Sequence, residues 1–137
     1  MTTPYPSDAQ PPDARRPMVL VAEDEDSVRR MISLVLRAIG YDSILCVDGL
    51  EAAERLESGE PVDALLMDLR MPRMGGLELV ARLRQHPEFR DLPVVAMSAY
   101  NDELQEREAK AAGATAFLAK PFTLTDLSHV LGEVLAR

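Results

Sequence analysis

Four acidic residues follow one another directly after an apolar run near the start of the chain. The run ends at Ala22, and the acids are Glu23, Asp24, Glu25 and Asp26. Two carboxylates about 4 Å apart repel each other by roughly 4 kcal/mol at an effective dielectric near 20. These side chains therefore either separate into water or hold a cation among them.

Three further reactive side chains follow later apolar runs: the acid Asp68, the hydroxyl of Ser98 and the amine of Lys120. Each has an ordinary explanation by itself, as a turn residue, a helix cap or a surface cation. The second run is followed by Asp48 and Gly49, a pair typical of a turn and a helix cap. An acid, a hydroxyl and an amine within two residues of the ends of three separate runs indicate a common site.

The apolar runs are short and nearly continuous, which is typical of parallel strands covered on both faces. They are Met18–Ala22, Ile44–Val47, Ala64–Met67, Val94–Met97 and Thr115–Leu118. Amphipathic helical patterns lie between them and after the last one. Five alternating units predict an α/β fold, with a doubly wound five-stranded parallel sheet, right-handed crossovers and helices on both faces.

The pattern at 101–112 is the weakest of the helical segments. Leu104 is its only large apolar residue, and the rest is mainly alanine and charge, with Gly113 expected to end the helix. A helix with so little to bury is expected to be loosely held.

In an open parallel sheet, ligands bind beyond the carboxyl ends of the strands. This rule brings the acids, Ser98 and Lys120 to one edge. Carboxylates are hard oxygen ligands for Mg²⁺, and a carboxylate beside a bound metal can attack a phosphoryl group. A lysine and a serine would then stabilise the phosphoryl oxygens. Glu23, Asp24 and Asp68 with Lys120 and Ser98 thus predict an aspartyl-phosphate site with Mg²⁺, or Mn²⁺, as its metal.

The bulk composition fits one domain with a core of its own and excludes several classes of protein. With 137 residues and a formal charge of -8, the chain lacks the basic excess of a nucleic-acid binder. No apolar stretch is long enough to insert in a membrane and no signal region is present, so a cytoplasmic location is expected. The single cysteine, Cys46, lies in an apolar run and is interpreted as a buried structural thiol.

Residues 1–17 differ from the rest of the chain. They hold five of the ten prolines and no large aliphatic residue except Met1, so we interpret them as a disordered tail before a domain at 18–137.

Four motifs make residues 18–137 similar to the receiver domain of bacterial two-component response regulators, which has a flavodoxin-like (βα)5 fold. They are Glu23-Asp24, MDLRMPRMGG at Met67–Gly76, MSAY at Met97–Tyr100 and KPF at Lys120–Phe122. The second fits the family pattern DxxMPxxxG. Found in this order and at these separations, the four motifs together are highly specific.

The resemblance implies a role for each matching residue. Asp68 would accept the phosphoryl group, and Glu23, Asp24, Asp68 and the backbone carbonyl of Arg70 would hold Mg²⁺. Ser98 and Lys120 would contact the phosphoryl group after transfer. The Lys120–Pro121 peptide bond would be cis, a form that is costly except before proline.

A switch is also implied. Ser98 would move toward the phosphoryl group, and Phe117, which replaces the tyrosine of many relatives, would rotate into the vacated space. That movement would change a surface made by the fourth helix, fifth strand and fifth helix. Arg70 and Tyr100, each two residues beyond a site residue, would tune the rate of dephosphorylation.

The partners implied are a sensor histidine kinase or histidine phosphotransferase, and a downstream protein target or phosphorelay partner. No residues remain after the last helical pattern for an output domain, so a single-domain regulator is expected. It would catalyse its own phosphorylation and dephosphorylation without being a turnover enzyme. Choice of kinase is expected to depend on the first helix, where four polar residues lie off the apolar stripe: Arg29, Arg30, Ser33 and Arg37.

Two alternatives remain from other classes. A degenerate receiver could act as a phosphorylation-independent scaffold, but such proteins normally lack the aspartate, an acid of the pair or the lysine, and all are present here. A phosphatase that uses an aspartyl-phosphate, such as a haloacid-dehalogenase-like enzyme, requires an acid two residues after the nucleophile, where this chain has Arg70.

Overall fold

One parallel sheet of five strands forms the centre of the molecule, with the strand order β2-β1-β3-β4-β5. The structure is a computed structural model that describes residues 16–99 and 103–136. The strands are β1 (Met18–Ala22), β2 (Asp42–Cys46), β3 (Ala64–Asp68), β4 (Val94–Ser98) and β5 (Ala116–Ala119). The architecture confirms the predicted fold class, and the strand boundaries lie within two residues of the apolar runs.

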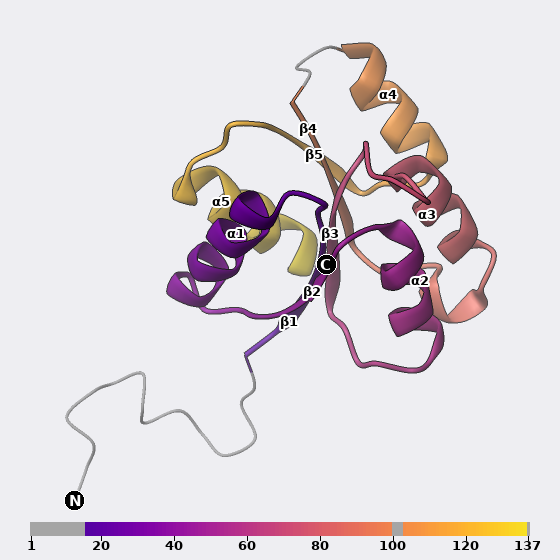
Figure 1. The fold of residues 1–137 in the computed structure, drawn as a ribbon, viewed down its shortest axis with the longest axis horizontal. Coiled ribbons are helices and arrows are strands. Elements are labelled where there is room, and N and C mark those ends of the chain that lie inside the picture. Colours follow the sequence, from indigo (N-terminus) through magenta and orange to yellow (C-terminus); the bar gives the residue numbers. More distant parts are fainter. Residues whose placement is uncertain (1–15, 100–102, 137) are drawn as a thin grey trace, which may run out of the picture.

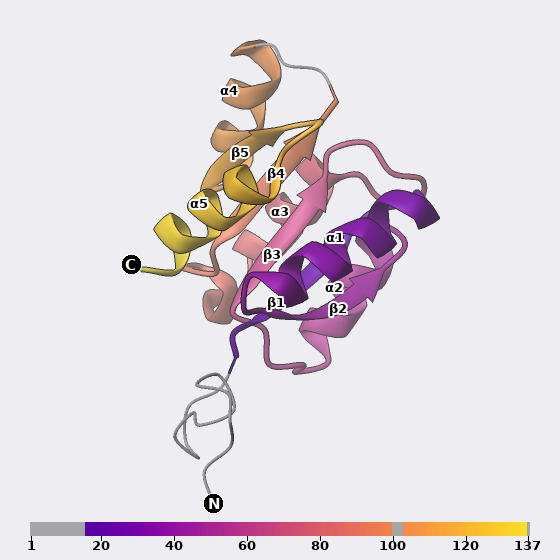
Figure 2. The ribbon, with the colours of Figure 1, turned by 90° about the vertical axis from the view of Figure 1, so that its left-hand side faces the viewer.

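Helices cover both faces of this sheet (Figures 1 and 2). They are α1 (Asp26–Ala38), α2 (Gly49–Glu57), α3 (Gly76–Arg84), α4 (Glu103–Ala112) and α5 (Leu124–Leu135), with a 3-10 helix η2 at Pro87–Phe89. Helices α1 and α5 lie on one face, and α2, α3 and α4 lie on the other (Figure 1). Among the described residues, no helix is both long and apolar enough to cross a membrane.

The strands are apolar at nearly every position because successive side chains enter different cores. In β1, Val19 and Val21 pack with α1 and α5, whereas Leu20 and Ala22 pack with α2 and α3. All four are fully buried. Successive side chains of a strand point to opposite faces of the sheet, and both faces are covered here, so apolar residues are expected at every position.

Side chains cap two of the helices, and the cap at Asp48 was predicted from the sequence. Asp48 caps α2 by accepting a hydrogen bond from the Glu51 N–H, and Thr123 forms a capping box with Asp126 at α5. Asp26 does not cap α1, although it stands at the start of the helix. Glu25 occupies the cap position, and Asp26 is the first helical residue, where its carboxylate pairs with the Arg29 guanidinium instead of a backbone N–H.

Helix α4 buries little, as its sequence predicts. Ala109 is its only buried residue, and Leu104 is 58% exposed. The prediction for Tyr100 lies outside the described residues. The predicted tail at 1–17 is described only from Arg16 onward. Arg16 Nε lies 3.2 Å from Asp42 Oδ1.

Candidate functional site

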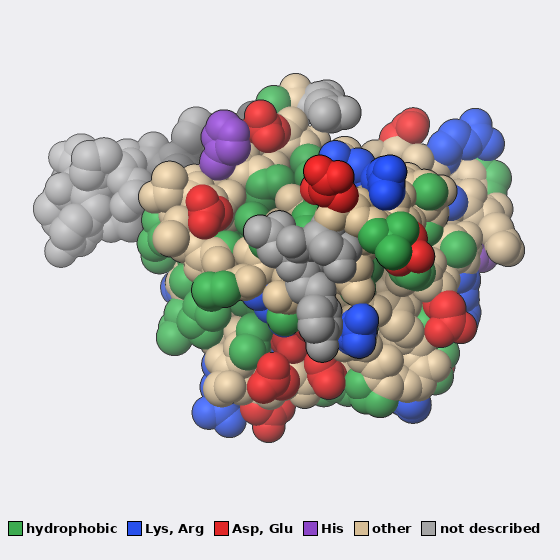
Figure 3. Space-filling model, turned by 90° about the horizontal axis from the view of Figure 1, so that it is seen from above, with side chains coloured by type: hydrophobic (Ala, Val, Ile, Leu, Met, Phe, Trp, Pro, Cys, Tyr) green, Lys and Arg blue, Asp and Glu red, His purple; other side chains and the backbone are tan. Residues whose placement is uncertain are grey.

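Four strands end beside one another at the same edge of the sheet, and each delivers one site residue. Glu23 directly follows β1, Asp68 and Ser98 are the last residues of β3 and β4, and Lys120 directly follows β5. The parallel register pairs Ala22 with Met67, Asp68 with Met97, and Ser98 with Ala119. The convergence predicted from the sequence is therefore present. Figure 3 shows the molecule from this side, where acidic and basic side chains occur together.

The Lys120 ammonium lies between two carboxylates. Its Nζ donates to Glu23 Oε1 at 2.7 Å and to Asp68 Oδ2 at 2.8 Å. Burial lowers the pKa of this ammonium, but the hydrogen bonds to Asp68 and Glu23 outweigh burial and leave the pKa above its ordinary value. Lys120 is thus held in its charged form at the centre of the acid group.

Glu23 is the most enclosed of these acids, with no exposed surface. Its Oε2 accepts from the Glu25 N–H at 3.1 Å, and its backbone carbonyl accepts from Arg29 Nη1 at 2.7 Å. Burial raises the pKa of Glu23 above its ordinary value despite the hydrogen bond from Lys120. The site therefore contains a carboxylate whose charge is expensive to keep without a cation nearby.

Three carboxylates are close enough to share one metal ion. Glu23, Asp24 and Asp68 each have a ligand oxygen within 4.8 Å of the others. Glu23 is buried and Asp24 is exposed, so the group is open to water on one side. A hard divalent cation that keeps part of its water shell suits such a set of oxygens.

The second oxygen of Asp68 points to the loop that follows β3. Asp68 Oδ1 accepts from the Arg70 N–H at 3.1 Å, while Oδ2 is the atom that contacts Lys120. Asp68 is 9% exposed, so the carboxylate is reachable from solvent although it ends a buried strand. The expectation for the Arg70 carbonyl as a metal ligand stays a prediction.

Ser98 and Phe117 lie on neighbouring strands behind this edge. Ser98 is 1% exposed, and its Oγ donates to Gln105 Oε1 in α4 at 2.6 Å. Phe117 is half-buried in β5, opposite Ala96 in the register, and packs against the core that α2, α3 and α4 cover. The peptide bond between Lys120 and Pro121 is cis, as the resemblance implies.

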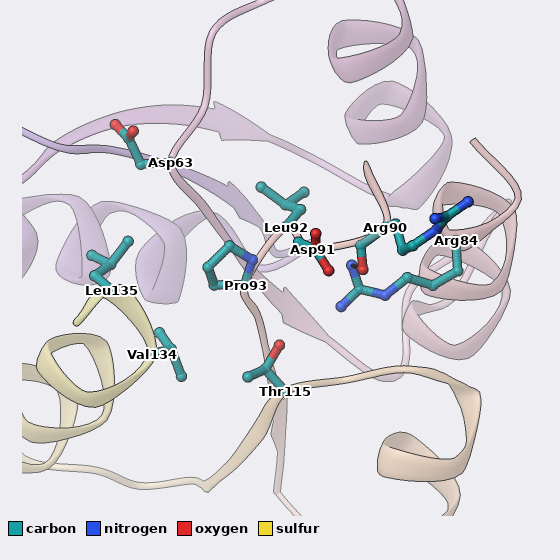
Figure 4. A pocket seen from close by; sticks show the side chains of 9 residues that line it. All are labelled: Asp63, Arg84, Arg90, Asp91, Leu92, Pro93, Thr115, Val134 and Leu135. Atoms are coloured by element: carbon teal, nitrogen blue, oxygen red, sulfur yellow. Dashed lines mark hydrogen bonds between the residues drawn. The ribbon is translucent and has the colours of Figure 1, made fainter. Parts of the chain in front are cut away.

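The site lies in a cleft of about 340 Å³ lined by eight residues: Asp24, Glu25, Val28, Asp68, Arg70, Ser98, Ala99 and Lys120. A larger hollow of about 610 Å³ lies at the opposite edge of the sheet (Figure 4). There, Asp63, Pro93 and Thr115 directly precede β3, β4 and β5. The smaller cleft is the candidate site, because it contains Asp68, Ser98 and Lys120 and lies at the carboxyl ends of the strands, where ligands bind in such sheets.

Two contacts between the start of α2 and the loop after Asp68 were not expected from the sequence. Asp48, identified there only as a helix cap, also accepts from Arg73 Nε at 2.7 Å, and the Gly49 N–H donates to the Met74 carbonyl at 3.0 Å. A β-carbon on Gly49 would lie 2.4 Å from that carbonyl oxygen. These contacts fix the loop after Asp68 against the start of α2. A glycine directly after a capping aspartate is the only sequence signal for them.

The predicted recognition face of α1 needs a correction. The Arg29 side chain is only 13% exposed, because it turns inward to the Glu23 carbonyl and pairs with Asp26. Ser33 is half-buried, and its Oγ lies 3.3 Å from Ser43 Oγ. Of the four proposed residues, Arg30 and Arg37 are the exposed ones.

Comparison with known proteins decides the family. The model of the response regulator receiver domain matches residues 19–132. The chain belongs to this family. The receiver domain is 34% identical over 118 residues to a chemotaxis protein CheY homolog of Campylobacter jejuni, an alignment that covers 85% of this chain and 91% of the relative.

Solved structures agree with this assignment. A putative response regulator from Chloroflexus aurantiacus is 35% identical, with a TM-score of 0.85, and the match covers 90% of this chain and 100% of that one. The receiver domain of the Pseudomonas aeruginosa sensor histidine kinase PA1611, which has a magnesium ion coordinated in its active site cleft, is 28% identical, with a TM-score of 0.82. That match covers 90% of this receiver domain and 100% of the other chain. The receiver is thus a CheY-like component of two-component signalling.

Proposed function

We propose that this receiver domain accepts a phosphoryl group on Asp68 and thereby switches a protein-interaction surface. The observation that carries this proposal is the Lys120 ammonium, which contacts both Glu23 and Asp68 beside a group of three carboxylates. That arrangement supplies a nucleophile, a fixed positive charge and oxygen ligands for a cation within one cleft.

Asp68 is the proposed nucleophile because it is the one carboxylate with both a fixed orientation and solvent access. The Arg70 N–H and Lys120 Nζ each hold one of its oxygens. A carboxylate oxygen forms a bond to phosphorus, and the bond from phosphorus to the donor breaks. The electron pair of that bond leaves with the donor, which is the imidazole nitrogen of a phosphohistidine or the carboxylate of a small acyl phosphate.

Lys120 and Ser98 stabilise the transferred group. Lys120 retains its contact to Glu23 and can offer its remaining protons to a phosphoryl oxygen, since an ammonium has three donors. Ser98 donates its hydroxyl proton to another phosphoryl oxygen. In the free domain, Lys120 instead offsets the repulsion between the two carboxylates that it joins.

Mg²⁺ fits the three carboxylates, and Mn²⁺ suits the same oxygens. Glu23, Asp24 and Asp68 would hold the ion, and it would supply positive charge for the phosphoryl oxygens when bound. The magnesium in the cleft of the PA1611 receiver supports this proposal.

The switch is proposed to run from Ser98 to Phe117 and to the surface of α4, β5 and α5. Phe117 lines a shallow hollow of about 450 Å³ between β5 and α5, and Ser98 and Ala119 are register neighbours on β4 and β5. A shift of Ser98 toward the phosphoryl group would leave space beside β5 for the aromatic ring. Bound partners would sense the changed surface.

The partners are proposed to be a sensor histidine kinase or a histidine phosphotransferase upstream, and a protein target or phosphorelay partner downstream. A cytoplasmic location follows from this role. The domain would catalyse its own phosphorylation and dephosphorylation without acting as a turnover enzyme. Kinase recognition is placed on the exposed Arg30 and Arg37 of α1. Reversing both charges should slow transfer from a cognate kinase and leave transfer from a small acyl phosphate unchanged; equal rates with the kinase would contradict this placement.

The decisive experiment measures the mass of the intact protein after incubation with Mg²⁺ and acetyl phosphate. The wild type should gain one phosphoryl group, and Asp68→Asn should gain none. Chelation of the metal should prevent the gain. The absence of any gain, also with a kinase mixture, would support the scaffold alternative, and catalytic release of phosphate from many substrates would support a phosphatase.

A further inference from the structure

Ser98 donates its hydroxyl proton to the side chain of Gln105, in the first turn of α4. The Oγ–Oε1 distance is 2.6 Å, and Ser98 is almost fully buried. A serine hydroxyl has one proton, so it donates to one acceptor at a time. An oxygen of a phosphoryl group on Asp68 would accept a hydrogen bond from the same hydroxyl. Gln105 and the phosphoryl group therefore compete as acceptors for one proton.

We propose that Gln105 is a positioning residue that holds the Ser98 hydroxyl in the unphosphorylated state. When Ser98 donates to the phosphoryl group instead, its hydrogen bond to Gln105 is lost and the first turn of α4 is released. This inference rests on the proposed phosphorylation of Asp68 and names how α4 detects it. It adds a direct hydrogen-bond link to α4 that does not pass through Phe117.

The two ends of α4 are held differently. At the C-terminal end, Arg84 of α3 donates to the Gly113 carbonyl through Nη2 at 2.7 Å and through Nε at 3.1 Å. The same guanidinium donates to the Phe89 carbonyl at 2.6 Å, so it joins the end of α4 to η2. Ala109, the only buried residue of α4, is also in the C-terminal half.

The first turn has far less apolar contact. Leu104, the only large aliphatic side chain of the helix, is 58% exposed. Gln105 is partly buried, and through Ser98 it connects the turn to the end of β4. Figures 1 and 2 show α4 at the periphery of the molecule, near the edge strand β5. A helix that is clamped at one end, and whose other end is held by contacts that include this hydrogen bond, can shift when the bond is lost.

Gly113 is suited to serve as the pivot. Its φ of +123° is one that side chains with a β-carbon rarely adopt, and an added β-carbon would lie 3.0 Å from Arg84 Cγ. The close approach of the Arg84 side chain to the helix end therefore suits a residue without a β-carbon. The C-terminal clamp and the Gln105 contact are separate, so a variant of one leaves the other in place.

The test is a double-mutant cycle between Ser98 and Gln105, with the initial rate of phosphoryl gain from acetyl phosphate and Mg²⁺ as the first readout. Gln105→Met keeps the length of the side chain and removes the acceptor. It should raise the rate by up to about fivefold, because a neutral hydrogen bond changes an equilibrium by roughly that factor. In a Ser98→Ala background, the same substitution should change nothing. Arg107→Met, on the same helix and exposed, is the matched control and should leave the rate unchanged.

The second readout is hydrogen exchange at the amides of 103–109. These amides should exchange faster in unphosphorylated Gln105→Met than in the wild type, and the phosphorylated wild type should resemble the variant. Loss of the Arg84 clamp by Arg84→Met should instead speed exchange at the C-terminal end of α4. The exchange data distinguish a released first turn from a general loss of folding.

The outcomes separate this inference from the proposed function. If the wild type gains no phosphoryl group, the proposed function fails, whatever the exchange data show. If the wild type is phosphorylated but Gln105→Met has an unchanged or lower rate, the inference is overturned and the proposed function stands. An equal increase in the Ser98 and Ser98→Ala backgrounds also overturns it, because Gln105 would then act without Ser98.

Discussion

Lys120 and Glu23, which are 97 positions apart, form an ion pair with a distance of 2.7 Å between Nζ and Oε1. The pair joins the ends of β5 and β1 across the carboxyl edge of the sheet. Asp68 completes the contact on the other side of the ammonium. The free receiver domain therefore carries one internal cation among the acids that would hold a metal.

Lys120→Met should destabilise the metal-free protein. The substitution keeps the apolar stem but leaves the buried Glu23 facing Asp68 without a cation, and removal of one partner of a buried ion pair costs about 3 kcal/mol. Urea unfolding at pH 7 with a chelator should show this loss in the free energy of unfolding. Mg²⁺ should restore part of it, and equal stability of variant and wild type without metal would contradict the role given to Lys120.

Glu57 should make stability depend on pH in the acid range. Hydrogen bonds from Arg82, and secondarily from His86, hold the pKa of this carboxyl below its ordinary value of 4.5. A depressed pKa contributes stability above the ordinary value and loses it as the pH falls through the folded value. Glu57→Gln should thus be less stable than the wild type by about 0.5–1 kcal/mol at pH 7, with the difference shrinking as the pH falls below 4.5. Urea unfolding across this range is the measurement, and a constant difference would refute the linkage.

Two glycine-to-alanine substitutions should have opposite effects. Gly49→Ala places a β-carbon 2.4 Å from the Met74 carbonyl oxygen, so the loop after Asp68 must shift. This crowding should cost about 1–3 kcal/mol and slow phosphoryl gain. Gly132→Ala is the matched control in α5, where no atom lies within 4 Å of the added carbon, and it should stabilise by about 1 kcal/mol. Thermal unfolding of both variants tests the pair, and a neutral Gly49→Ala would show that the loop is not fixed there.

Cys46 should be unreactive in the folded domain. The residue is fully buried, and burial raises the pKa of its thiol to about 12. A colourless disulfide reagent that releases a coloured thiolate should therefore react at pH 8 only after urea is added. Leu45→Cys in a Cys46→Ala background, at a neighbouring position that is 37% exposed, should react without urea. Rapid reaction of native wild type would indicate opening of the β2 edge.

The fold class and the group of residues at the candidate site were both predicted from the sequence, and the structure confirms the fold class. Apolar runs without polar alternation indicated strands buried on both faces, and the sheet rule then placed Asp68, Ser98 and Lys120 at one edge. In the structure, Glu23 and Asp24 follow β1, whereas Glu25 and Asp26 lie at the start of α1. These patterns are local, and they recur in each of the five strand–helix units of the chain.

Only the tertiary structure decided which side chains contact one another. Lys120 lies against Glu23 as well as Asp68, Arg29 turns inward, Arg73 pairs with Asp48, and Ser98 donates to Gln105. Each contact joins separate elements, and its existence depends on the register of the strands and the rotamers of long side chains. Hydrophobic periodicity carries no information about these choices, since it reports which face of an element is buried and not which polar group lies opposite.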